Sequence, residues 1–85
     1  MTVAAYRYVL EEAVFEAFVQ LPEDEADLLH SFFRWLAAHP GNTGDGSQTD
    51  AVGRTNYASL CGPFLVVHWT DDATREVRVV QIIRD

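Results

Sequence analysis

Hydrophobic positions change their spacing along the chain, and each change marks a predicted element. Residues 3–10 are rich in valine, tyrosine and leucine, which is typical of a strand. Over Glu11–Gln20 the apolar residues recur at steps of three and four, which predicts a helix. The same spacing predicts a second helix from Pro22 to about Ala38, because proline is tolerated in the first turn of a helix. Its apolar stripe includes Leu29, Phe32, Phe33 and Leu36.

The second half of the chain predicts three strands joined by short turns. They cover Arg54–Leu60, Phe64–Thr70 and Glu76–Ile83, and the short connections indicate an antiparallel meander. The middle strand is apolar on both faces, which predicts a central position in the sheet. Residues 41–53 are rich in glycine and small polar residues, and we expect a loop there. The predicted fold class is α+β: a single domain over residues 1–85, with a first strand, a helical hairpin packed on the sheet, and a three-stranded antiparallel meander. The predicted core packs the second helix against Val66, Val80 and Ile82, or against their neighbours on the opposite face of the sheet.

Charge is distributed unevenly along the 85 residues. The net charge is −7, and the chain contains no lysine. Residues 1–50 hold nine acidic groups and two arginines, whereas residues 51–85 hold four of each, so the first half carries the whole excess. An acidic surface repels phosphate backbones, which argues against nucleic-acid binding over the whole surface. We expect no secretory signal and no membrane span, and the single cysteine favours a cytoplasmic protein.

Motifs for metals and cofactors are absent from the sequence. His30, His39, His68 and Cys61 lack the paired short spacing of zinc ligands, and no glycine-rich phosphate loop follows a strand. We therefore expect neither a metal nor a cofactor. His68 alternates with Phe64 and Val66 on the predicted central strand. It is either a general base or a hydrogen-bonded histidine at the margin of the core.

The arginines of the second half allow two interpretations. Guanidinium groups suit phosphate or carboxylate ligands, but acidic neighbours in the sequence also offer ion pairs. Arg78 and Arg84 share the parity of Val80 and Ile82, so they are predicted to flank an apolar patch on one sheet face. We predict that Arg54, Arg78 and Arg84 dock an acidic or amphipathic segment of another chain, or a second copy of this chain.

Three segments of the sequence together resemble a known family. They are YRYVLEEAVFEAFVQLPEDEADLLHSFFRWLAAHP (residues 6–40), VGRTNYASLCGPFLVVHW (residues 52–69) and REVRVVQI (residues 75–82). Their order of a strand, a Leu-Pro break between helices, a glycine-marked hairpin and a last strand resembles the RelE/ParE superfamily of toxins. These toxins belong to bacterial type II toxin–antitoxin, or plasmid stabilisation, systems.

The resemblance implies a function and also shows departures from the family pattern. Ribonuclease members cleave messenger RNA on the ribosome with basic residues and a tyrosine or histidine, the ParE branch poisons gyrase, and an antitoxin neutralises both. The family's arginine after the hairpin glycine is Phe64 here, and its lysines are replaced within Tyr57–Leu60. The residues expected to remain from a catalytic site are Arg84 and Arg54 as phosphate binders and His68 as proton carrier.

Two functions from different classes are therefore open. The first is a divergent toxin component with a degraded ribonuclease site, an antitoxin partner and a ribosomal, messenger-RNA or gyrase target. The second is a non-catalytic protein-binding module that kept the fold. Ribonuclease activity stays possible by resemblance, although key basic residues are missing.

Overall fold

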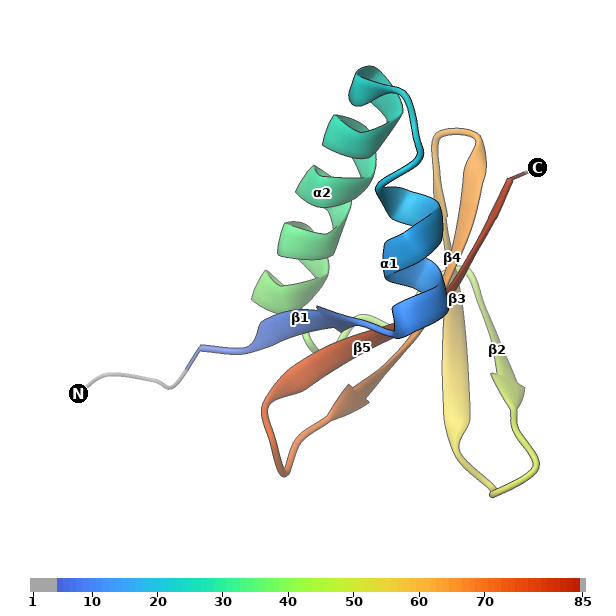
Figure 1. Cartoon of the computed structure of the whole chain (residues 1–85). Helices are drawn as coiled ribbons and strands as arrows, with labels where there is room; N and C mark the ends of the chain where they lie inside the picture. The colour runs from blue at the N-terminus through green and yellow to red at the C-terminus, as the bar shows by residue number, and fades with distance from the viewer. Residues whose placement is uncertain (1–4, 85) are drawn as a thin grey trace.

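The computed structural model describes residues 5–84, so residues 3 and 4 of the predicted first strand lie outside the described part. Figure 1 shows two helices beside one curved sheet. The elements in chain order are β1 (Arg7–Leu10), α1 (Glu12–Phe18), α2 (Glu23–Ala38), β2 (Gly46–Thr49), β3 (Thr55–Cys61), β4 (Phe64–Asp71) and β5 (Glu76–Arg84).

The sheet has five strands in the order β1-β5-β4-β3-β2. β3, β4 and β5 pair consecutively and antiparallel, as predicted, and β4 lies in the centre. The sheet is mixed, because β1, whose partner the sequence pattern did not specify, pairs in parallel with β5. This register places Tyr8 beside Val77 and Leu10 beside Val79, which extends the apolar face that the helices cover.

The predicted loop at residues 41–53 contains a strand, β2, which pairs antiparallel with β3. Its four residues are polar or glycine and all are exposed, so it lacks the alternation by which strands are recognised. Asp45 attaches this strand to β3. Its N–H donates to the Ala58 carbonyl over 2.7 Å, and its carboxylate accepts from the Leu60 N–H over 2.8 Å.

Both helices lie on one face of the sheet, where they enclose the hydrophobic core (Figure 1). The buried residues of α2 are Leu29, Phe33 and Leu36, as its apolar stripe predicts, whereas Phe32 is only partly buried. The sheet contributes buried Phe64, Val66, Val77 and Val79 to the core, with Ile82 partly buried against it. On β5 the core contains Val79, the opposite-face neighbour of Val80, and not Val80 itself.

A register shift between Val67 and His68 explains the position of Val80. Val67 pairs with Gln81 but His68 pairs with Val79, so Val80 is an extra residue in β5. The bulge reverses the parity of β5 on either side of it. Arg84 pairs with Phe64 on the helix-covered face, whereas Arg78 pairs with Trp69 on the opposite face. The predicted placement of both arginines on one face is therefore wrong.

Candidate functional site

The face of the sheet that the helices leave uncovered, here called the open face, displays both apolar and charged side chains. Leu60 on β3 is 63% exposed and Ile83 on β5 is 40% exposed. Arg54, Trp69 and Arg78 lie on the same side, because strand residues two apart share a face and Trp69 pairs with Arg78. This face combines aromatic, aliphatic and cationic groups without a covering element.

Glu76 organises the cations at the β1 and β5 side of the open face. Its carboxylate accepts from Arg7 Nη2 over 2.8 Å and from Arg78 Nη1 over 2.9 Å, and the Thr74 hydroxyl donates to it over 3.1 Å. The hydrogen bond from Arg7 is the main reason that the pKa of Glu76 is lowered below its ordinary value of 4.5. Glu76 therefore stays ionised near neutral pH and neutralises part of the charge of both arginines.

Arg54 is held at the β2 and β3 side of the open face by an aromatic ring and a carboxylate. Its guanidinium carbon lies 4.3 Å from the centre of the Trp69 ring, and its Nε lies 3.3 Å from Asp50 Oδ2. The backbone N–H groups of Arg54 and Val52 and the Asn56 amide also donate to the Asp50 carboxylate. The Arg54 N–H makes the largest contribution to lowering the pKa of Asp50.

The sheet forks beside Arg54. β3 and β4 are paired only as far as Tyr57 and His68, but β4 continues with β5 to Asp71, and β3 continues with β2 back to Thr55. A cavity of about 580 Å³ opens there, lined by Arg54, Tyr57 and Trp69 together with the loop after α2. The indole Nε1 of Trp69 is buried and has no hydrogen-bond partner among the described residues.

His68, a predicted proton carrier, lies under the helices and not on the open face. It is 1% exposed, and its Nε2 lies 2.8 Å from the Ser59 hydroxyl. Burial lowers the pKa of the imidazole below its ordinary value of 6.5. This environment fits a neutral histidine of the core, the second of the two interpretations that the sequence left open.

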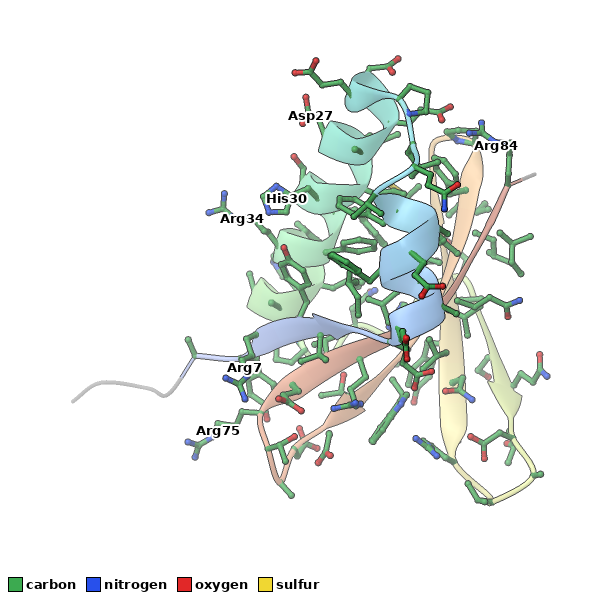
Figure 2. All side chains as sticks on the ribbon, in the orientation of Figure 1. Arg7, Asp27, His30, Arg34, Arg75 and Arg84 are labelled. Carbon is green, nitrogen blue, oxygen red and sulfur yellow. The ribbon has the colours of Figure 1, made fainter. Side chains whose placement is uncertain are left out.

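Arg84, a predicted phosphate binder, lies at the end of β5 beside α2. Its guanidinium forms an ion pair with the Glu25 carboxylate and lies 4.8 Å from the centre of the Phe64 ring. Figure 2 shows Arg84 at the opposite side of the molecule from Arg7 and Arg75. Arg54, His68 and Arg84 are therefore not brought together in one site, and their catalytic roles stay predictions.

Glu76 and Trp69 are the parts of the open face that sequence reasoning missed. The partnership of Glu76 with Arg7 spans nearly the whole chain and depends on the parallel pairing of β1 with β5. Within residues 5–84 no cluster of three potential metal ligands occurs, and no helix is long and apolar enough to cross a bilayer.

Comparison with known proteins gives a clear result for the structure alone. No protein-family model and no curated protein matches the sequence. A chain of the RelBE2 toxin–antitoxin complex from Mycobacterium tuberculosis matches with a TM-score of 0.78 and 13% identity, covering 96% of this chain and 100% of that one. A chain of the RelE–RelB complex from Pyrococcus horikoshii OT3 matches with a TM-score of 0.76 and 14% identity, covering 95% and 96%.

The chain has a RelE-like toxin fold. On this RelE-like scaffold, four of the six arginines form ion pairs: Arg7, Arg54, Arg78 and Arg84. Arg34 and Arg75 form none with any residue between positions 5 and 84. The guanidinium groups of the open face are therefore partly neutralised by carboxylates, which makes them weaker ligands for a phosphate.

Proposed function

We propose that this chain is the toxin-fold component of a type II toxin–antitoxin pair, that it binds an antitoxin in the cytoplasm, and that its ribonuclease site is degraded. The observation that carries the proposal is a RelE-like fold over 95–96% of the chain whose strand arginines are paired with carboxylates. Both similar structures are complexes of a toxin with an antitoxin. Their assembly supports an antitoxin as the first partner to test.

The arrangement of arginines supports the proposal that the ribonuclease site is degraded. Cleavage of a phosphodiester builds negative charge on the reacting phosphate, which convergent cations must stabilise. Phe64 stands where the family resemblance places the hairpin arginine, and the nearby Arg84 is committed to Glu25. Removal of such cations generally costs orders of magnitude in rate, so we expect binding without rapid cleavage.

The same neutralised arginines favour a second candidate function. A non-catalytic module that kept the fold binds a protein partner and has no toxic action. The two candidates differ in the target: a toxin acts on the ribosome with its messenger RNA, or on gyrase, whereas the module acts only through its partner. Growth after expression separates them, because only the toxin slows it.

The experiment expresses the chain alone and together with the protein encoded by the adjacent gene. Growth arrest by the chain alone, relieved by a co-purifying neighbour, is the expected result for the toxin. Co-purification without growth arrest supports the binding module instead. If the neighbour neither co-purifies nor changes growth, the proposed pairing is wrong.

A second measurement isolates catalysis. Messenger-RNA cleavage is followed in translating extracts for the wild type, Arg84→Ala and Arg75→Ala. Arg75 serves as the matched control, because it is exposed and lies away from Arg84 (Figure 2). We expect no cleavage with any of the three proteins. Strong cleavage that disappears only with Arg84→Ala would show that the site is active and not degraded.

A further inference from the structure

A groove between β1 and the C-terminal half of α2 is separate from the open face. Its volume is about 640 Å³, and it is lined mainly by Tyr6, Tyr8, Arg34, Ala37, Ala38 and Pro40. The two alanines leave space on the helix, and the two tyrosines supply broad apolar surface on the strand. We call this the β1 groove. Its lining is mainly apolar, with Arg34 on the helix side.

β1 is at the edge of the described sheet, so one row of its backbone groups has no strand partner within residues 5–84. The Arg7 N–H donates to the Arg75 carbonyl and the Glu11 N–H donates to the Val79 carbonyl, each over 3.1 Å. Odd-numbered positions therefore face β5. Because successive residues of a parallel strand alternate, the N–H and C=O groups of Tyr6 and Tyr8 face away from β5, along the groove.

Positive charge gathers around this groove in a protein whose net charge is −7. Figure 2 shows Arg7, Arg34 and Arg75 on the same side of the molecule. Arg34 and Arg75 form no ion pair within the described residues 5–84, and Arg7 is paired with Glu76 while remaining largely exposed. Two acidic groups lie on the same side: Asp27 is on the first half of α2 (Figure 2), and Asp72 accepts from the Tyr6 hydroxyl over 2.7 Å.

We propose that the β1 groove binds an extended acidic segment of the partner chain as an added strand. The segment pairs its backbone with Tyr8 and Tyr6, places small apolar side chains over Ala37 and Ala38, and directs carboxylates toward Arg34 and Arg75. Strand addition at an exposed edge derives affinity from main-chain hydrogen bonds and specificity from alternate side chains. This inference rests on the proposed function, because it names the binding site of that partner.

Charge distinguishes this occupant from two others. A second copy related by two-fold symmetry would bring the same arginines face to face, and this repulsion disfavours it. A nucleic-acid strand would gain from the arginines but leave the free strand edge and the alanine floor without partners. An acidic peptide satisfies all three features together.

The first test uses a short peptide of alternating glutamate and valine as the probe, with the full chain at low salt. Amide hydrogen exchange should show new protection at Tyr8 and Tyr6, whereas the Arg7 and Val9 amides, which already face β5, should not change. Arg34→Glu should weaken binding about tenfold or more. The matched control, Gln20→Glu with Gln48→Glu, lowers the net charge by the same two units at exposed sites away from the groove and should bind as the wild type does.

A steric variant tests the groove without changing charge. Ala38→Trp fills the floor and should abolish peptide binding, while Ala17→Trp on the exposed side of α1 should not. Circular dichroism checks that each variant is folded. If Ala17→Trp and Ala38→Trp weaken binding equally, or if the peptide binds without protecting Tyr8, the groove is not the site.

Experiments with the partner chain distinguish the groove proposal from the proposed toxin–antitoxin pairing. A co-purifying neighbour that protects Tyr8 and is lost with Ala38→Trp supports both. A neighbour that co-purifies but leaves Tyr8 exchanging freely overturns the groove and retains the toxin–antitoxin pairing. If the peptide binds but the protein of the adjacent gene does not, the toxin–antitoxin pairing is refuted and the groove is retained as a binding site. A doubled mass in light scattering that Arg34→Glu abolishes, or tighter binding of a mixed-sequence RNA, would assign the groove to another occupant.

Discussion

His68 on β4 and Ser59 on β3 are hydrogen-bonded beneath the helices, with 2.8 Å between the imidazole Nε2 and the hydroxyl oxygen. Both side chains are buried, at 1% and 4% exposure. The pair lies on the same face as the apolar core and is separated from solvent by it. Burial disfavours the charged imidazole, so the pKa of His68 is lowered in the folded chain.

This pKa shift predicts a pH dependence of stability. Because the folded pKa is lower than the unfolded value of 6.5, the unfolded chain binds more protons just below that pH. The free energy of unfolding should therefore be highest above pH 6.5 and fall as the pH decreases toward the folded pKa. Urea unfolding between about pH 5 and 7.5 measures it, above the range in which Glu25, Asp50 and Glu76 titrate.

The control for this prediction compares two histidines. His68→Gln should flatten the pH dependence, whatever it does to the absolute stability. His30→Gln changes an exposed residue and should leave the slope as it is. A slope that survives His68→Gln but vanishes with His30→Gln would contradict the assignment to the buried imidazole.

The core prediction concerns two phenylalanines of different exposure. Phe33 is fully buried between α2 and the sheet, whereas Phe15 on α1 is 53% exposed. Phe33→Ala should lower the free energy of unfolding by about 3–5 kcal/mol, because it removes a buried ring and leaves a cavity. Phe15→Ala should change it far less. Denaturant unfolding of both variants checks the difference, and equal losses would contradict the placement of α2 on the core.

The elements that the sequence predicted are those with strong hydrophobic patterns. The stripe of α2 identified Leu29, Phe33 and Leu36 as core residues, and the two-sided apolar run of β4 predicted its central position. In both cases the apolar pattern indicates burial, because the buried face of a helix, or both faces of a central strand, consist of apolar residues. The spacing of apolar residues was therefore enough to predict the buried face of α2 and the central position of β4.

The elements that the sequence missed depend on contacts between distant residues. β2 is polar throughout, and its strand conformation follows from pairing with β3. The bulge at Val80 reverses parity within β5, where no turn residue marks it, so period-two reasoning placed Arg78 and Arg84 on one face. The predicted docking surface shared this error, because it placed Arg78 and Arg84 on one face by their parity along β5.

Gly44 provides a test of how β2 is held. Its φ is +67°, and a Cβ atom there would lie 2.6 Å from the Ala58 carbonyl oxygen, which is backbone and cannot swing away. Gly44→Ala should cost at least about 1–2 kcal/mol from the left-handed conformation alone. The matched variant Gly46→Ala has open space around the new methyl group and should be nearly neutral.

The expected local effect of Gly44→Ala is release of β2 from β3. Hydrogen exchange should accelerate at the Asp45 and Leu60 amides, which bond across this junction, while the amides between β4 and β5 keep their protection. If Gly46→Ala releases the strand and Gly44→Ala does not, the close approach at Ala58 is not what positions β2.

The last prediction concerns the effect of the Glu76 carboxylate on anion binding by Arg7 and Arg78. It accepts from Arg7 and Arg78 together, so Glu76→Gln would leave two guanidinium groups with a neutral partner. We expect this variant to be retained on heparin to a higher salt concentration than the wild type. Glu12→Gln changes the net charge equally at an exposed helix position and should shift retention much less. Thermal unfolding at the same salt checks that both variants are folded, since Glu76→Gln also weakens the side-chain ion pair between Arg7 of β1 and β5. Equal retention of the two variants would show that only net charge matters, and that pairing with Glu76 does not mask a local anion site.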